Sequence, residues 1–313
     1  MAADWTRRTL LTATGLAAAA PALAAAPRVM PIWPDGPPGG QGVSVAETVV
    51  ERNPPPNPLR DRYVKHVRDP ALTVFEPRKP NGASLLMTPG GGYKWVVMDK
   101  EGYECAARFA AAGVTVYVAS YRLPADGWAA GPAAPLQDAQ RALRLVRSLA
   151  ADRERVGVMG FSAGGHVAGC LSLMFDRPAY DPVDAIDGLS ARPDLATLIY
   201  PVATLRQGLA HAGSRAELLG ATPTLAQERD WSLEENARPD APPTFLLHAG
   251  DDASVPVENS LNLHGALRAA GVTTELHVFE EGGHGFGLRF TAGKPVAAWP
   301  DLVLAWWKRK GFV

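Results

Sequence analysis

The most informative stretch for the fold of this chain is Val156-Gly157-Val158-Met159-Gly160-Phe161-Ser162-Ala163-Gly164-Gly165. An apolar, β-branched run leads into a G-x-S-x-G pattern, and small residues follow as the start of a helix. The glycines permit a tight turn that holds Ser162 in a strained backbone conformation, with its hydroxyl above the sheet at a helix N-terminus. The stretch therefore predicts a nucleophile elbow between a strand and a helix. If no base is available, a glycine-rich turn that only caps the helix is the alternative.

The segments around this stretch alternate between strand-like and helix-like runs. We expect strands at 43–51, 71–75, 84–88, 114–121, 155–160, 195–202, 244–249 and 274–279, and helices at 103–112, 136–150, 163–175, 257–270 and 301–310. This alternation predicts a mostly parallel twisted sheet with helices on both faces, in one domain over 43–313. The long connection 203–243 is too polar for an extensive apolar lid, so we expect an open site without a large lid.

Composition excludes several classes of protein. Hydrophobic residues make up 47% of the 313 residues and charged residues 20%, which fits a globular chain and excludes a disordered tail or a coiled coil. The 31 basic residues against 32 acidic ones give a net charge of −1. No field of one sign therefore exists to attract nucleic acid.

The first residues have the features of an export signal. Arg7-Arg8 precedes an apolar run of small residues, and Ala22-Leu23-Ala24 is typical of a cleavage site. We expect residues 1–24 to be removed and the protein to be periplasmic or secreted, without stable membrane association afterwards. The arrangement resembles a twin-arginine signal, with Sec export as the alternative; an N-terminal amphipathic helix is the plainer interpretation. Residues 25–42 are a Pro/Gly-rich leader that should lie along the surface with Trp33 as an anchor.

A serine nucleophile needs a histidine base and an acid that orients it. His284 lies in Glu281-Gly282-Gly283-His284-Gly285, just after an expected strand. A histidine surrounded by glycines is not expected to serve in core packing. The acid is expected after the strand 244–249, where the Asp-x-x-Val-Pro register selects Asp252 and leaves Asp251 as the alternative. The order Ser162, Asp252, His284 is that of α/β-hydrolases. Of the other histidines, His248 suits a core position, His166 is too close to Ser162 along the chain, and His66, His211, His264 and His277 suggest no function.

Pro89-Gly90-Gly91-Gly92-Tyr93 follows an expected strand and supplies the remaining requirement, an oxyanion hole. The backbone N–H groups of Gly91, Gly92 and Ala163 would bind the developing oxyanion. A phosphate-binding loop is the alternative, but the Gly-Lys-Ser/Thr and G-x-G-x-x-G fingerprints are missing.

With these motifs the chain resembles the α/β-hydrolase esterases, and more closely the exported bacterial carbohydrate esterases related to acetylxylan esterases. The resemblance covers about residues 30–310 and includes Ile32-Trp33-Pro34-Asp35-Gly36, Tyr121-Arg122-Leu123 and Pro135-Leu136-Gln137-Asp138-Ala139. It implies an α/β-hydrolase fold in which the helices that carry Cys105 and Cys170 cover opposite faces of the sheet. Although export favours disulfides, we therefore expect two free, buried thiols. No cofactor and no metal site are expected.

These features predict a serine esterase that hydrolyses short-chain acyl esters, such as acetyl esters on plant carbohydrates. Because the base must be neutral, activity should fall below about pH 6.5. Four aromatic residues near the expected mouth are candidates for substrate contacts, with core packing as the alternative: Tyr93, Trp95, Trp128 and Trp231. The rival functions are a general short-chain carboxylesterase or peptidase and, in another class, a non-catalytic binding protein on this scaffold. The sequence does not specify the acyl group, the sugar or the oligomeric state.

Overall fold

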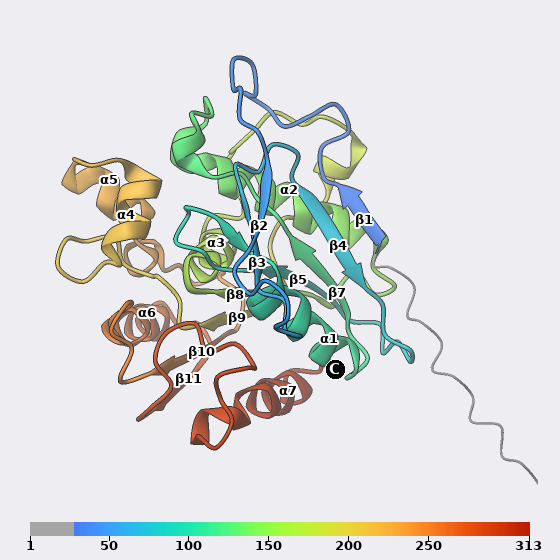
Figure 1. Ribbon diagram of the computed structural model, residues 1–313, viewed down its shortest axis with the longest axis vertical. Coiled ribbons are helices and arrows are strands. Elements are labelled where there is room, and N and C mark those ends of the chain that lie inside the picture. Colours follow the sequence, from blue (N-terminus) through green and yellow to red (C-terminus); the bar gives the residue numbers. More distant parts are fainter. Residues whose placement is uncertain (1–27) are drawn as a thin grey trace, which may run out of the picture.

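The computed structural model describes residues 28–313, so the predicted export signal at 1–24 lies outside the described residues. Its central sheet has eight strands in the order β1-β4-β7-β5-β8-β9-β10-β11 (Figure 1). β1 and β4 pair antiparallel, as do β4 and β7, and all the other pairs are parallel. The strands are β1 (Arg28–Pro31), β4 (Ala71–Phe75), β5 (Ser84–Thr88), β7 (Thr115–Ala119), β8 (Val156–Phe161), β9 (Ala196–Ile199), β10 (Thr244–Ala249) and β11 (Thr274–Phe279).

Helices cover both faces of this sheet, as the alternating pattern predicts. Apolar side chains of α2 (Ala134–Leu149), α3 (Ser162–Leu173) and α6 (Glu258–Ala269) belong to the core on one face. Those of α1 (Glu104–Ala110) and α7 (Trp299–Arg309) belong to the core on the other face. Phe109 of α1 packs against Trp299 and Trp307 of α7, and the two helices lie side by side in Figure 1.

This division places the two cysteines in different cores. Cys105 lies in α1 and Cys170 in α3, and both thiols are buried and free. The two cysteines therefore lie on opposite faces of the sheet, as the family resemblance implies.

A second, three-stranded sheet lies outside the predicted pattern. It has the order β2-β3-β6, with β2 at Thr48–Glu51, β3 at Arg62–Lys65 and β6 at Val96–Val97. The expected strand 43–51 is thus wrong in its first residues, and β1, β3 and β6 were not expected. β1 is mostly exposed, β3 begins and ends with a charged residue, and β6 has only two residues, so none has the apolar run or the alternation that predicts a strand.

The leader from residue 28 onward and the long connection both pack on the rest of the fold. After β1, Trp33 is buried and donates from Nε1 to Oδ1 of Asp138 at 2.8 Å, which anchors the leader to α2. The connection 203–243 forms α4 (Ala212–Leu219) and α5 (Leu225–Trp231), which lie together on the left of Figure 1. This is a small insertion rather than a large lid.

Short helical turns complete the description. A π-helix, η1 (Asp99–Tyr103), precedes α1, so the expected helix 103–112 begins earlier and in a different form. The 3-10 turns are η2 (Pro124–Asp126), η3 (Gly131–Ala133), η4 (Ala185–Gly188), η5 (Leu233–Asn236) and η6 (Pro295–Ala298). Within residues 28–313, no helix combines the length and the hydropathy needed to cross a membrane.

Candidate active site

Ser162 stands at the junction of β8 and α3 with a φ of +52°, the strained conformation expected of an elbow. The flanking glycines are required by close backbone packing. A Cβ on Gly160 would lie 2.2 Å from the Gly164 carbonyl oxygen, and one on Gly164 would lie 2.1 Å from the Thr88 carbonyl oxygen. Side chains at either position would therefore push β5, β8 and α3 apart.

A chain of hydrogen bonds joins the serine, a histidine and an aspartate. His284 Nε2 lies 2.8 Å from Ser162 Oγ, and His284 Nδ1 lies 2.6 Å from Asp252 Oδ2. Because an ionised carboxylate only accepts, Nδ1 carries the proton and Nε2 is free to accept the serine proton. The arrangement can therefore generate a nucleophilic oxygen.

The Asp252 carboxylate is held from several sides. Its Oδ1 accepts the backbone N–H groups of Ser254 and Val255, each at 2.9 Å, and Oδ2 also lies 3.3 Å from Nε2 of the buried His248. Burial alone would raise the pKa of Asp252, but the hydrogen bonds from His248 and His284 outweigh burial and hold it well below its usual range. Asp252 therefore stays ionised next to the imidazole.

Asp251, the alternative acid, has a different position. Its Oδ1 accepts the N–H groups of Gly282 at 2.9 Å and Gly283 at 2.7 Å, at the start of the turn that carries His284. The structure brings Asp252, and not Asp251, to the His284 ring.

The loop that follows β5 lies beside Ser162 with free backbone donors. Gly91 has a φ of +137°, and a Cβ there would lie 2.0 Å from the Trp95 carbonyl oxygen, so only glycine fits. Within residues 28–313, the N–H groups of Gly91, Gly92 and Ala163 have no hydrogen-bond partner. Gly91 and Gly92 line the same cleft as Ser162, whereas Ala163 is the second residue of α3, where helical N–H groups are unpaired.

The buried carboxylate of Glu101 stabilises this loop through hydrogen bonds. Glu101 Oε2 accepts the Gly90 N–H at 2.9 Å, and Oε1 accepts the Tyr200 hydroxyl at 3.2 Å. Tyr200 Oη in turn accepts the Gly287 N–H at 3.2 Å, and its ring packs edge-on against His284. Glu101 and Tyr200 thus connect the glycine loop to the His284 turn.

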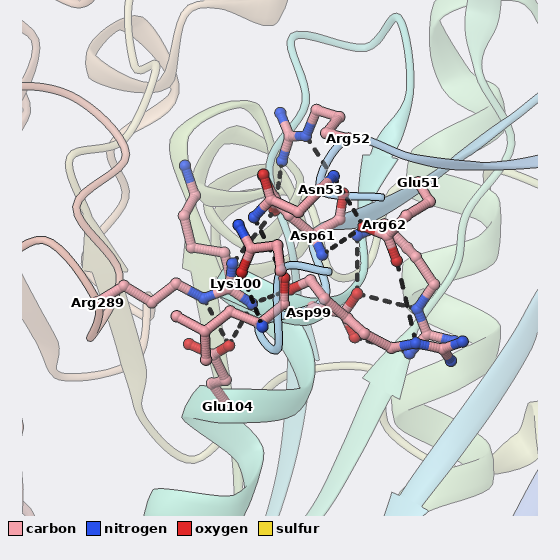
Figure 2. Close-up of polar contacts among 12 residues, drawn as sticks. Glu51, Arg52, Asn53, Asp61, Arg62, Asp99, Lys100, Glu104 and Arg289 are labelled. Carbon is pink, nitrogen blue, oxygen red and sulfur yellow. Dashed lines mark hydrogen bonds and ion pairs between the residues drawn. The ribbon is translucent and has the colours of Figure 1, made fainter. Parts of the chain in front are cut away.

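Ion pairs fix both ends of the segment 99–104, and Figure 2 shows Asp99 with Arg62 and Glu104 with Arg289. Asp99 is 6% exposed and pairs with Arg62 of β3 at 2.7 Å, and Glu104 accepts from Arg289 Nε at 2.6 Å. Burial raises the pKa of Asp99, but Arg62 outweighs it and lowers that pKa. The segment 99–104 is therefore tied both to the small sheet and to the chain beyond His284.

Ser162 opens into a cleft of about 390 Å³. It is lined by Gly91, Gly92, Lys94, Trp95, Val97, Lys100, Glu101, Ser162, His211, Gly213, Glu217, Ser254, His284 and Gly285. Three of these residues come from the connection 203–243, which therefore forms one wall. Residues 28–313 contain no cluster of His, Cys, Asp and Glu suited to a metal ion.

Of the four aromatic candidates, only Trp95 lines this cleft. Tyr93 is buried, with its hydroxyl 2.7 Å from His166 Nδ1. Trp231 is buried at the end of α5, and its carbonyl accepts from His166 Nε2 at 2.7 Å. Trp128 lies against the Pro/Gly-rich leader with Arg122 over its ring. Tyr93, Trp128 and Trp231 are buried and do not line the cleft, which fits the alternative of core packing rather than the predicted substrate contacts.

The comparison of the chain with known families agrees with this geometry. Residues 85–288, which include the glycine loop and the three hydrogen-bonded residues, match a family described by its α/β-hydrolase fold. The chain belongs to the α/β-hydrolase family. A solved structure similar to this α/β-hydrolase is the acetyl ester-xyloside bifunctional hydrolase of Caldicellulosiruptor lactoaceticus, with 33% identity and a TM-score of 0.72. The match covers 93% of this chain and 99% of that one.

Other relatives are esterases or xylan-related enzymes. The acetylxylan esterase of Xylanibacter ruminicola is 31% identical over 69% of this chain and 43% of its own length. The endo-1,4-beta-xylanase B of Butyrivibrio fibrisolvens is 37% identical over 64% of this chain and 32% of its own length. This α/β-hydrolase therefore spans less than half the length of these two curated relatives. A Thermogutta terrifontis esterase with bound propionate aligns with a TM-score of 0.62 at 26% identity, over 80% of this chain and 93% of that one.

Three residues at the site were not identified from the sequence: Glu101, Tyr200 and His211. Tyr200 directly follows β9, at the carboxyl edge of the sheet where open α/β sheets bind ligands, so its position was a usable signal. His211 follows the same strand, in the long connection 203–243. Glu101 had no such signal, since it is one acidic residue among several in a polar segment.

Proposed function

We propose that this protein is a serine esterase that hydrolyses short-chain acyl esters, above all acetyl esters, on carbohydrates derived from plant polysaccharides. The observation that carries the proposal is the hydrogen-bond chain Ser162–His284–Asp252 beside the unpaired N–H groups of Gly91 and Gly92. It supplies a nucleophile, a base, an orienting acid and donors for an oxyanion in one cleft.

Acylation follows from the tautomer of His284. Nε2 takes the Ser162 proton while Oγ bonds to the ester carbon, and the carbonyl π electrons move to the oxygen. The N–H groups of Gly91, Gly92 and Ala163 stabilise this oxyanion, and Asp252 stabilises the imidazolium. The intermediate then collapses, His284 returns the proton to the leaving alcohol oxygen, and an acyl-enzyme remains.

Deacylation repeats these steps with water. His284 Nε2 takes one water proton as the hydroxide oxygen bonds to the acyl carbon, and the second tetrahedral intermediate collapses with the proton returned to Ser162 Oγ. The carboxylic acid leaves, and the hydrogen-bond chain is restored.

The substrate class is supported by the relatives and by the shape of the cleft. Two of the relatives named above are, by their names, an acetylxylan esterase and an acetyl ester-xyloside bifunctional hydrolase. The cleft is far larger than an acetyl group and is lined by charged, polar and aromatic side chains, which suits a polar alcohol with many hydroxyl groups.

One assay tests the proposal. We expect the wild-type protein to release acetate from acetylated xylan and to hydrolyse p-nitrophenyl acetate faster than p-nitrophenyl octanoate. Ser162→Ala should lower kcat by at least about 10⁴-fold, because it removes the nucleophile. Ser172→Ala, a matched change in the same helix away from the cleft, should remain active. If the wild-type protein hydrolyses no ester, the non-catalytic binding function is favoured instead.

A general short-chain carboxylesterase is the second candidate. The similarity to the Thermogutta terrifontis esterase, whose structures hold propionate and butyrate, favours it. Hydrolysis of p-nitrophenyl esters without any release of acetate from acetylated xylan or xylo-oligosaccharides would select this function.

We also propose that the protein is exported, because residues 1–24 have a basic start, an apolar middle and an Ala-x-Ala end. Mass spectrometry of the protein from its native cell envelope or medium should find a mature N-terminus near residue 25. A full-length cytoplasmic protein would contradict this proposal.

A further inference from the structure

A second histidine lies in the cleft, across from His284. His211 is half-buried, precedes α4 and lines the same cleft as Ser162. Its Cε1 is 3.7 Å from the position that a Cβ on Gly92 would occupy, so the ring stands against the loop that offers the oxyanion donors. The mechanism described above does not use this side chain.

The helix that follows determines which ring nitrogen carries the proton. His211 Nδ1 accepts the backbone N–H of Ser214 at 3.1 Å and lies 2.8 Å from Ser214 Oγ, so the ring caps α4. A nitrogen that accepts an N–H carries no proton of its own, so the proton of the neutral ring is on Nε2. Burial, together with the positive charge of His284 when protonated, lowers the pKa of His211, with Asp252 acting in the opposite direction. His211 therefore presents a neutral Nε2–H donor.

That donor has no partner in the part of the chain that the structure describes. The two lysine side chains that line the cleft are less constrained than His211. The Lys94 ammonium lies over the Trp95 ring and the Lys100 ammonium over the Phe290 ring, each on a flexible stem. The His211 ring is instead fixed by the contacts of its Nδ1 with Ser214, so little conformational entropy is lost when Nε2–H binds an acceptor.

The geometry of ester binding indicates which part of the substrate meets this donor. With the ester carbon at Ser162 Oγ and its oxygen at Gly91 and Gly92, a two-carbon acyl group fills little of the 390 Å³ cleft. The alcohol moiety must occupy most of the remaining space, where His211 forms part of the wall. A sugar places hydroxyl groups on the carbons next to its ester, and a hydroxyl oxygen is a good acceptor for a neutral N–H.

We propose that His211 is a specificity-determining residue, whose Nε2–H donates a hydrogen bond to a free hydroxyl next to the ester on the sugar. This inference rests on the proposed function and adds to it a preference for partly acetylated sugars over esters of alcohols that lack a neighbouring hydroxyl. A site with a fixed, unpaired donor discriminates against a substrate that cannot satisfy it.

The test compares two esters that differ only in the hydroxyls on the two carbons next to the ester. Methyl 3-O-acetyl-β-xyloside has free hydroxyls on both neighbouring carbons, and its 2,4-dideoxy analogue has none. We expect the wild-type kcat/KM to be about tenfold higher for the hydroxylated ester, the effect of about one hydrogen bond. In His211→Asn the ratio should fall to near one, because asparagine caps a helix well but its amide is shorter than the imidazole.

Two further variants separate the donor from the fold. His211→Phe keeps a ring in the wall but lacks both nitrogens, so it should lose the same preference, with far-UV circular dichroism showing that the variant is folded. His264→Asn is a matched change on α6 outside the cleft lining and should keep the wild-type ratio.

The outcomes distinguish this inference from the proposed function. A tenfold preference that survives in both His211 variants overturns the inference alone, as does an equal loss of activity toward both esters. If the wild-type protein hydrolyses p-nitrophenyl acetate but neither xyloside, the proposed carbohydrate function fails as well.

Discussion

At the scale of single residues, Glu101 has no part in the proposed bond-making steps but contacts the segments that position the reacting groups. It is 3% exposed, and its two oxygens accept from the Gly90 N–H and the Tyr200 hydroxyl. One contact holds the glycine loop, and the other leads to the ring that packs on His284. We regard Glu101 as a positioning residue for the oxyanion donors and for the base.

Replacement of Glu101 should therefore lower kcat more than it changes KM. Glu101→Ala leaves the buried Gly90 N–H without a partner, at a cost of about 1–3 kcal/mol, and allows the loop to shift. We expect kcat for p-nitrophenyl acetate to fall by about 10- to 100-fold, as small misplacements of catalytic groups do. Glu101→Gln can still accept from Gly90 through its carbonyl and should recover most of the activity.

The control for this prediction is thermal stability, measured for both variants. If Glu101→Ala retains full kcat at a temperature where it is folded, or if Glu101→Gln is as impaired as Glu101→Ala, the positioning role is wrong.

At the scale of elements, α3 does more than present Ser162. His166, one turn further along, is fully buried and joins α3 to two other segments. Its Nε2–H donates to the Trp231 carbonyl at the end of α5, so its Nδ1 accepts the hydroxyl of Tyr93 from the glycine loop. This imidazole thus links the nucleophile helix, the loop and the connection 203–243, and the bond in which Nδ1 accepts the Tyr93 hydroxyl needs the neutral ring.

This arrangement predicts a pH-dependent stability. Burial lowers the pKa of His166 from 6.5 to about 4, although the hydrogen bond to Trp231 acts in the opposite direction. The unfolded chain therefore binds this proton more tightly than the folded one, and stability is fully present above pH 6.5 and lost as the pH falls toward 4. The loss should amount to about 3 kcal/mol of unfolding free energy.

Urea unfolding at several pH values, for the wild type and His166→Gln, measures this contribution. Glutamine can accept from Tyr93 and donate to Trp231 but does not titrate, so the variant should lose about 3 kcal/mol less between pH 6.5 and 4. Parallel stability curves for the two proteins would show that His166 does not account for the acid sensitivity.

At the scale of the whole molecule, the sheet separates two cores, and with them the two thiols. Cys105 is 0% exposed in the core with α1 and α7, and Cys170 is 2% exposed in the core with α2, α3 and α6. Burial raises the pKa of both thiols, which further lowers their reactivity.

Export would favour a disulfide between the two cysteines, whereas their burial in separate cores predicts that both thiols stay free. Ellman's reagent should detect no thiol in the folded protein and two in denaturant, and a reducing agent should not change Tm. A single disulfide, found as the absence of titratable thiol in non-reducing denaturant, would contradict the packing of α1 and α3 on opposite faces.

Several features of this protein can be predicted from short stretches of its sequence, because each depends mainly on residues that are neighbours in the chain. The apolar runs of β5, β8 and β10 and the periodic pattern of α2 predict the core elements, because the hydrophobic period of each element can be read from consecutive residues. The tight turn at Ser162 and the Asp-x-x-Val-Pro register of Asp252 are equally local. The strands β3 and β6 of the second sheet were not predicted, because their stability comes from pairing with neighbouring strands rather than from their own residues.

The other side chains around Ser162 could be identified only from the folded chain. Glu101 and His211 reach the cleft, whereas Tyr93, Trp128 and Trp231 do not, and nothing in the residues beside them distinguishes these cases. The physical reason is that these positions depend on contacts between segments far apart in the chain, such as Glu101 with Tyr200 and His166 with Trp231. A sequence shows the chemistry of such groups, but only the packed fold determines which of them share a cavity.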